Sequence, residues 1–242
     1  MGVWVFGAAA YAAADASYET IGDITLELDL SSQGPFGPAV VSLPTGANSP
    51  RPVVVALHGR NEKPERMCAL VREWVGVRAF VVCPRGTPAA EGAGFDFVDD
   101  TAASREVEAS VSALVSRFGS MASATDRVYV GFSRGAFVGP AVVARAAKDY
   151  RSVILVEGGQ DLWTEAAVAD FAAGGTARVL FACGTPDCWS ESERPASALE
   201  RAGIPSKRVM GEGQGHDMGG TVKAAIEKAF PWVVDGDDRW SY

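Results

Sequence analysis

The sequence lacks the features that would place the chain across a membrane or on a nucleic acid. In 242 residues no apolar run reaches the roughly 18 residues that span a bilayer. Basic residues are outnumbered, with 22 Lys and Arg against 30 Asp and Glu and a formal net charge of -8. This balance argues against partners such as nucleic acid or an anionic membrane surface, because both attract basic patches. The sequence also lacks internal repeats and low-complexity linkers, so it predicts one domain.

Charge is missing altogether from the first residues. Residues 1–14 carry no charged side chain and end in alanines, and small residues at Ala14 and Ala16 precede Ser17 as at a signal-peptidase site. The basic segment that opens a signal peptide is missing. We therefore expect residues 1–22 to be a remnant of an export signal, with an ordered segment over the sheet edge as the alternative. Residues 23–242 are expected to form a single domain without a large lid.

Cysteine is scarce, and its four residues do not follow a metal-binding pattern. No C-x-x-C pair or histidine partner accompanies them, so we expect no metal and no cofactor. Cys68 falls on a predicted helix and Cys83 at the end of the next strand, while Cys183 and Cys188 bracket a proline-containing turn. We expect the disulfides Cys68–Cys83 and Cys183–Cys188, with four buried free thiols as the alternative. Disulfides persist in oxidising compartments, so they favour a secreted or periplasmic location over the cytoplasm.

Hydrophobic periodicity predicts the order of the elements. Residues 24–30 alternate apolar and polar side chains, as in a half-exposed strand, and residues 39–43 resemble its antiparallel partner. Residues 53–57 are continuously apolar and β-branched, which is typical of a strand buried on both faces of a parallel sheet. Further strands are expected at 79–83, 127–132, 153–156, 179–183 and 207–210, and helices at 65–77, 103–118, 134–148, 164–173, 194–202 and 218–229. This alternation predicts an α/β fold with a doubly wound, mostly parallel sheet of about eight strands and helices on both faces.

A G-x-S-x-G motif lies where a predicted strand meets a predicted helix. It reads Gly131-Phe132-Ser133-Arg134-Gly135. The sharp turn holds the serine in strained backbone geometry above the sheet, and the flanking glycines avoid steric clashes. The helix N-terminus behind it favours developing negative charge. Ser133 is therefore the predicted nucleophile.

A serine hydroxyl needs a base to remove its proton, and the sequence offers only two histidines. His216 lies in a glycine-rich loop between the last predicted strand and the last helix, whereas His58 comes well before the serine. Where a G-x-S-x-G serine lies on such a strand-to-helix turn, the acid and then the histidine follow it in the chain. This order selects His216 as the expected general base.

His58 and Gly59 directly follow the strand at 53–57. The turn after this strand supplies one N–H of an oxyanion hole, and the residue after the nucleophile supplies the other. We therefore expect the backbone N–H groups of Arg60 and Arg134 to form the hole. His58 is expected to support the turn rather than to act in catalysis or to bind a metal.

The acid that orients the histidine should follow a strand between Ser133 and His216. Asp187 comes in a Gly-Thr-Pro-Asp turn directly after the strand at 179–183 and is the predicted acid. Asp161, after the preceding strand, is the alternative, and Glu157 is a weaker third.

Together these motifs (L-H-G-R, G-F-S-R-G, G-T-P-D and G-H) resemble those of the α/β-hydrolase superfamily, over about residues 51–233. The chain is most similar to the small, lidless serine esterases of the carboxylesterase, feruloyl-esterase and polyester-depolymerase kind. The resemblance implies hydrolysis of a small-molecule or polymeric ester through an acyl-enzyme, by a chain expected to be a monomer. An acyl-peptidase or thioesterase is the alternative within enzymes. A non-catalytic binding protein with this fold is the alternative of another class.

Four aromatic residues follow strand ends and are candidates for the walls of a substrate pocket. Phe95 and Phe97 lie in a loop rich in Gly, Ala and Pro, and Trp163 and Trp189 follow later strands. The alternative for the loop with the two phenylalanines is an ordinary surface connection, whereas the two tryptophans can stack on a substrate or belong to the core.

Overall fold

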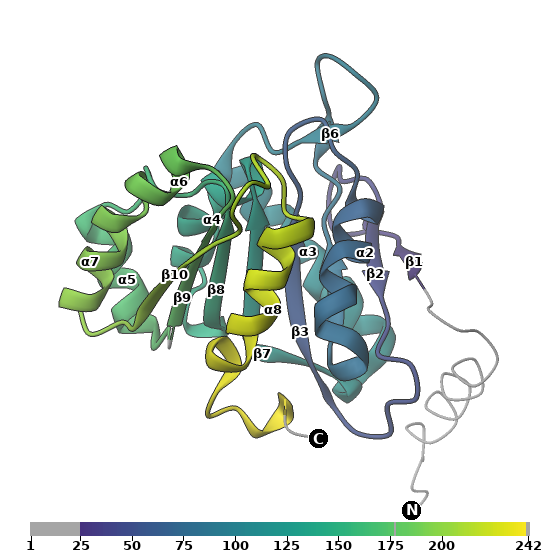
Figure 1. Ribbon diagram of the computed structural model, residues 1–242. Helices are drawn as coiled ribbons and strands as arrows, with labels where there is room; N and C mark the ends of the chain where they lie inside the picture. Colours follow the sequence, from purple (N-terminus) through teal and green to yellow (C-terminus); the bar gives the residue numbers. More distant parts are fainter. Residues whose placement is uncertain (1–24, 177, 241–242) are drawn as a thin grey trace, which may run out of the picture.

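A single mixed sheet forms the centre of the protein, in the order β1-β2-β4-β3-β7-β8-β9-β10 (Figure 1). The computed structural model describes residues 25–176 and 178–240, so the expectation for residues 1–22 lies outside the described residues. β2 pairs antiparallel with β1 and β4, and all other neighbours are parallel. The strands are β1 (Thr25–Leu28), β2 (Ala39–Ser42), β3 (Arg51–Leu57), β4 (Phe80–Cys83), β7 (Ala122–Phe132), β8 (Tyr150–Val156), β9 (Arg178–Cys183) and β10 (Ser206–Met210). The predicted sheet is confirmed.

Helices cover both faces of this sheet. On one face lie α2 (Pro64–Val75) and α8 (Gly220–Val234). On the other lie α3 (Asp100–Phe118), α4 (Arg134–Ala144), α5 (Glu165–Gly174) and α7 (Glu193–Arg201). In the described part of the chain, no helix has both the length and the apolar character that a membrane span requires.

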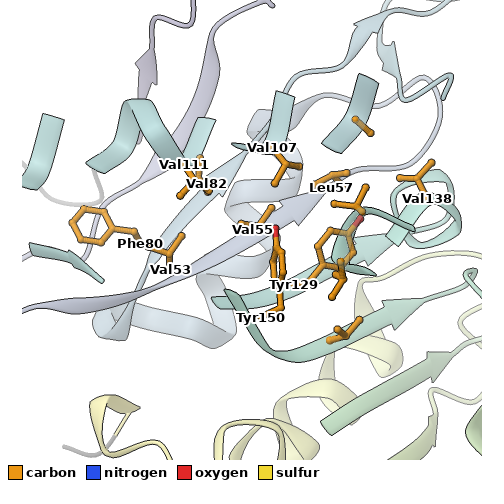
Figure 2. Packing of buried hydrophobic residues seen from close by; sticks show 14 of the residues in the cluster. Val53, Val55, Leu57, Phe80, Val82, Val107, Val111, Tyr129, Val138 and Tyr150 are labelled. Atoms are coloured by element: carbon orange, nitrogen blue, oxygen red, sulfur yellow. The ribbon is translucent and has the colours of Figure 1, made fainter. Parts of the chain in front are cut away.

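The alternating side chains of β3 explain why this strand is apolar throughout. Val53, Val55 and Leu57 face the helices α3 and α4, where they pack with residues such as Val107 (Figure 2). Val54 and the other alternate residues belong to the second cluster, beneath α2 and α8. A strand with a core on each side has no polar face, which is why its sequence lacks period-two alternation. Such burial contributes roughly 1.5–3 kcal/mol per large aliphatic side chain.

Two short elements were not predicted. One is the hairpin of β5 (Thr87–Pro88) and β6 (Phe95–Asp96), whose strands are too short to show a periodicity. It docks on the turn after β3, since Asn61 N–H donates to Phe95 O and Phe95 N–H to Glu62 O, both at 2.8 Å. The other is helix α6 (Pro186–Glu191), which begins where Thr185 caps the N–H of Cys188.

Both predicted disulfides are present. Cys68–Cys83 joins α2 to the end of β4, and Cys183–Cys188 joins the end of β9 to α6. The first closes a separation of 15 residues and lies in the core, whereas the second closes one of 5 residues. The second disulfide therefore constrains a single turn, and that turn borders the candidate site described next.

Candidate active site

Ser133 lies in a sharp turn between β7 and α4, with φ 49° and ψ -108°. Its N–H donates to Val156 O at 2.8 Å, which fixes the turn against the end of β8. The flanking glycines are required by close approach rather than by their own dihedral angles. A Cβ on Gly131 would lie 2.6 Å from the backbone of Gly135, and a Cβ on Gly135 would lie 2.2 Å from Leu57 O. The turn therefore holds the serine in a conformation that L-residues rarely adopt, as at many functional sites.

His216, in the loop between β10 and α8, contacts Ser133 and Glu157 with its two ring nitrogens. Nε2 lies 2.8 Å from Ser133 Oγ, and Nδ1 lies 3.0 Å from Glu157 Oε2. Because an ionised carboxylate can only accept, Nδ1 carries the proton, and Nε2 is left to accept the hydroxyl hydrogen of Ser133. The ring therefore has the tautomer and orientation of a general base.

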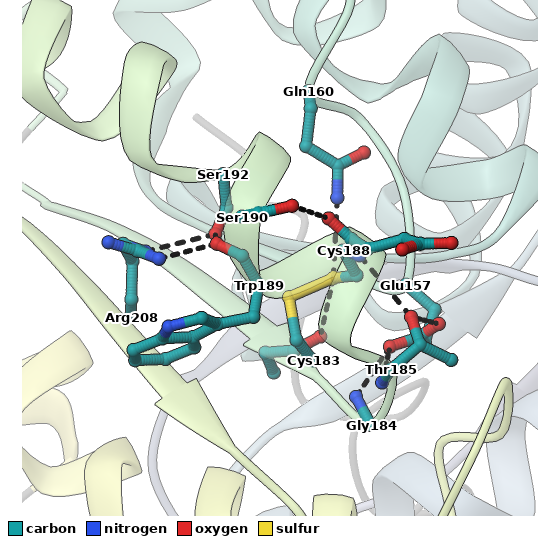
Figure 3. Close-up of a disulfide and its surroundings, with 12 residues drawn as sticks. Glu157, Gln160, Cys183, Gly184, Thr185, Cys188, Trp189, Ser190, Ser192 and Arg208 are labelled. Atoms are coloured by element: carbon teal, nitrogen blue, oxygen red, sulfur yellow. Dashed lines mark hydrogen bonds between the residues drawn. A yellow bond between two sulfur atoms is a disulfide. The ribbon is translucent and has the colours of Figure 1, made fainter.

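The Glu157 carboxylate is held by four donors. It directly follows β8 with a left-handed φ of 51°, and its side chain is 1% exposed. Its Oε1 accepts from the N–H groups of Gly184 and Thr185, and its Oε2 accepts from Thr185 Oγ1 at 2.9 Å (Figure 3). His216 Nδ1–H is the fourth donor. Multiple hydrogen bonds to an ionised carboxylate compensate for its burial.

The prediction that Asp187 contacts the histidine was wrong. Pro186 begins helix α6, which makes Asp187 a first-turn residue with an exposed side chain. The turn before it supplies the N–H groups that bind Glu157 instead. Asp161 is also exposed and does not contact His216. Glu157 was the weakest of the three candidates in the sequence. The signal that favours it is its position: it follows β8 immediately and so lies beside the Ser133 turn at the end of the neighbouring strand β7.

The turn after β3 lies against the turn that carries Ser133. Gly135 N–H donates to His58 O at 3.1 Å, which joins the two turns. On either side of Arg60 the N–H groups are occupied, since Gly59 donates to Glu62 Oε2 at 3.0 Å and Asn61 to the hairpin. Among the described residues, no hydrogen bond uses the Arg60 N–H.

Arg134 offers a matching donor. It is the first residue of α4, and a first-turn N–H has no partner within its own helix. The backbone N–H groups of Arg60 and Arg134 thus remain available beside Ser133. Two such donors can stabilise an oxyanion that develops on a carbonyl attacked by the serine.

His58 is fully buried behind this turn. Its Nδ1 lies 2.7 Å from Gly59 O and its Nε2 lies 2.8 Å from Arg85 O. Glu106 in turn accepts from the N–H groups of Arg85 and Gly86, and burial raises the pKa of its carboxyl. These contacts are those of a residue that supports the turn.

Two clefts meet at Ser133. The first has a volume of about 370 Å³ and is lined by Gly59, Arg60, Glu62, Arg66, Phe132, Ser133, His216 and Asp217. The second, which we call the arginine cleft, has about 390 Å³ and is lined by Arg60, Ser133, Arg134, Phe137, Glu157 and residues 158–161. A larger cavity of about 760 Å³ between α5 and the α6–α7 segment shares Gln160 and Asp161 with the arginine cleft. Space on both sides of the serine can receive the two halves of a substrate.

The four aromatic candidates are placed differently from one another. Phe97 is buried in the core and packs on His58 with ring centroids 4.7 Å apart, so its prediction as a pocket residue was wrong. Phe95 stacks under Arg85, and Trp189 under Arg208, and neither lines the three cavities described above. Only Trp163 lines one of them, the 760 Å³ cavity.

Comparison with known proteins identifies the fold. No family model matches the chain, and no curated protein matches its sequence. Among solved structures it is similar to esterase PE8 (TM-score 0.62, 19% identity, covering 82% of this chain and 98% of that one). It is also similar to a ferulic acid esterase (TM-score 0.63, 16% identity, covering 88% of this chain and 97% of that one). A third similar structure is a carboxylesterase from Mesorhizobium loti (TM-score 0.60, 22% identity, covering 80% of this chain and 93% of that one). The chain therefore has the α/β-hydrolase fold.

Proposed function

We propose that the protein is a serine hydrolase that cleaves carboxylic esters through an acyl-enzyme. The observation that carries this proposal is the continuous contact from Ser133 Oγ to His216 Nε2 at 2.8 Å and from His216 Nδ1 to Glu157 at 3.0 Å. A fold of this kind hosts many functions, so the activity is argued from the site. The esterases with similar structures support it.

In the proposed reaction, His216 takes the hydroxyl proton as Ser133 Oγ attacks the ester carbonyl. The N–H groups of Arg60 and Arg134 bind the resulting oxyanion. Collapse of the tetrahedral intermediate breaks the bond to the alkoxy oxygen, which leaves with the proton from His216. Water then attacks the acyl-enzyme by the same steps and releases the acid. Glu157 holds the ring and stabilises the imidazolium without taking the proton itself.

The direct test is labelling by a fluorophosphonate, which forms a covalent adduct with an activated serine. We expect one adduct per chain, located at Ser133 by peptide mass spectrometry, and an initial burst of 4-nitrophenol from 4-nitrophenyl esters when acylation is faster than deacylation. Heat-denatured protein is the control, because a reaction that needs the folded site stops on unfolding. Label at another residue, or none with the fold intact, would contradict the proposal.

We further propose that residues 23–242 form one lidless domain and that the chain functions in an oxidising, extracytoplasmic compartment. The central eight-stranded sheet, to which elements from the whole described chain contribute, supports the first statement. The two disulfides support the second.

The Cys183–Cys188 disulfide should affect turnover more than stability. It pins the turn whose N–H groups bind Glu157, and a misplacement of a catalytic group by about 1 Å costs on the order of 100-fold in rate. Replacing both cysteines by serine should therefore lower kcat by roughly tenfold to 100-fold. Because the Cys183–Cys188 disulfide closes only a short loop, its removal should lower the free energy of unfolding by only about 2 kcal/mol.

The matched control is the double serine variant of Cys68 and Cys83. That disulfide closes a longer loop and joins α2 to β4, neither of which carries Ser133, Glu157 or His216, so the expected loss of stability is about 3 kcal/mol with little loss of kcat below the melting temperature. Turnover and chemical denaturation of both variants check this. Equal effects of the two variants on kcat would show that the turn does not position the acid.

A further inference from the structure

The arginine cleft contains two guanidinium groups whose outer nitrogens bind nothing in the described part of the chain. Arg60 Nε lies 3.3 Å from Asp96 Oδ2, and Arg134 Nε lies 3.2 Å from Asp96 Oδ1. Within the described residues, no hydrogen bond or ion pair involves an η nitrogen of either side chain. Each arginine is thus paired with Asp96 through its inner nitrogen and keeps its terminal amino groups free, and the Arg60 side chain is 65% exposed.

Asp96 holds both arginines but compensates only one of their two charges. Its side chain is 11% exposed, and the hairpin that carries it is bonded through its backbone to the turn after β3. Asp96 Oδ1 is within ion-pair distance of Arg134 Nε but accepts no hydrogen bond. The outer nitrogens of Arg134 therefore do not bind this oxygen. The site retains donors suited to a further oxyanion.

The arginine of the other cleft shows the contrast. Arg66 uses both of its η nitrogens, one for Glu62 at 2.5 Å and one for Asp217 at 3.2 Å. Burial acts to raise the pKa of Asp217, but hydrogen bonds from Gly219 N–H and Arg66 outweigh it and lower the pKa. Asp217 is therefore an ionised partner, and Arg66 has no outer nitrogen to offer.

An apolar surface lies next to the free guanidinium groups. The Phe137 residue is 37% exposed, and Arg134 stacks on its ring at 5.4 Å. Stacking and the ion pair together restrict the Arg134 side chain, which is only 21% exposed. A restricted guanidinium loses less conformational entropy when it binds an anion.

We propose that the arginine cleft binds a carboxylate carried by the ester substrate, through the η nitrogens of Arg60 and Arg134, with an apolar part of the substrate on Phe137. This rests on the proposed esterase function. Arg60 lies in the turn after β3, and Arg134 directly follows Ser133. A carboxylate bound to both therefore lies close to the scissile bond. Guanidinium groups bind a carboxylate by paired, charge-assisted hydrogen bonds. The carboxylate of Asp161, which lines the same cleft, repels an anion and so limits the preference for an anionic ester over a neutral one.

The test compares esters of similar shape that differ in charge, and each kcat/KM is divided by the rate of hydroxide-catalysed hydrolysis of the same ester, because the substituents also change the reactivity of the scissile bond. The acyl series is the 4-nitrophenyl esters of 4-carboxybenzoate, 4-carbamoylbenzoate and 4-(trimethylammonio)benzoate. The alcohol series is the butyrate esters of 4-hydroxybenzoate and 4-hydroxybenzamide. In at least one series we expect kcat/KM for the carboxylate to exceed that for the neutral amide by about tenfold or more, the range of a charge-assisted hydrogen bond. The cationic ester should be the poorest substrate of its series.

Four variants assign the preference to residues. Because the backbones of Arg60 and Arg134 belong to the proposed oxyanion hole, the readout is the ratio of kcat/KM for the anionic and neutral esters, not either rate alone. Arg60→Gln and Arg134→Gln should each lower this ratio several-fold. Arg145→Gln is the matched control and should leave the ratio unchanged, because Arg145 pairs with Asp100 and lines none of the three cavities, while Asp161→Asn should raise it.

The outcomes separate this inference from the proposed function. If neutral esters are cleaved and Ser133 is labelled, but the carboxylate is not preferred in either series, the subsite is refuted and the esterase function stands. A preference that survives both Arg60→Gln and Arg134→Gln, or that Arg145→Gln abolishes, refutes the assignment to this cleft. If neither ester turnover nor labelling occurs, the function and the subsite fail together.

Discussion

Replacing Glu157 by Gln is expected to lower kcat by on the order of 10^4-fold while the fold persists, as when the acid of a catalytic triad loses its charge. The amide has the same shape, and its oxygen can still accept from Gly184 and Thr185. Its nitrogen, however, is a donor facing His216, so the ring has to present Nδ1 as the acceptor. Nε2 then carries the hydrogen and cannot accept the proton of Ser133.

Asp187→Asn is the matched control, since it makes the same chemical change at the residue that the sequence pattern favoured. Its side chain is exposed on α6, so turnover should stay within about twofold of the parent. Steady-state kinetics with a neutral aryl ester and thermal melting of all variants supply the measurement. Should Asp187→Asn or Asp161→Asn lose activity while Glu157→Gln keeps it, Glu157 is not the acid.

The fold was predictable because burial in a doubly wound sheet dictates local sequence patterns. Strands such as 53–57 and 179–183 are buried on both faces and are therefore continuously apolar, which marks them in the sequence. The sharp turn that carries Ser133, the proposed nucleophile, was predictable for a similar reason. Close backbone contacts leave no space for a Cβ at Gly131 or Gly135, and this produces the G-x-S-x-G motif.

Which carboxylate contacts His216 could not be predicted from the same kind of pattern. Glu157 and Asp187 each follow a parallel strand, and the sequence does not show which carboxylate turns inward. The structure separates them by an unpredicted element, since α6 begins at Pro186 and moves Asp187 to the surface. Two of the four donors to Glu157 are backbone N–H groups, which every non-proline residue has, and these two therefore leave no trace in the sequence.

The pocket residues depended on long-range packing in the same way. Phe97 was a candidate because it follows a strand end, yet the hairpin turns it into the core against His58. The same hairpin places Asp96 between Arg60 and Arg134. Strands of two residues carry no periodic signal, so neither placement could be read from the sequence.

The second large effect on kcat is expected when Ser133 or His216 is replaced by alanine. These variants test whether the two residues act as one unit. Ser133→Ala and His216→Ala should each lower kcat on the order of 10^4-fold or more, since the serine is a weak nucleophile without the base and the base has nothing to activate without the serine. The double variant should be little worse than either single variant, because each change removes the same step. Independent contributions would instead multiply.

The choice between the two histidines follows from the same set of variants. His58→Ala removes a buried ring whose two nitrogens lie 2.7 Å from Gly59 O and 2.8 Å from Arg85 O, so it should lower the melting temperature and weaken the oxyanion turn. Fluorophosphonate should still label Ser133 in that protein, at a reduced rate, because His216 remains in contact with the serine. In His216→Ala, labelling should fall to the rate of an unactivated hydroxyl. The reverse result, with labelling lost in His58→Ala and retained in His216→Ala, would assign the base to His58 and leave the 2.8 Å contact of His216 with Ser133 without a catalytic role.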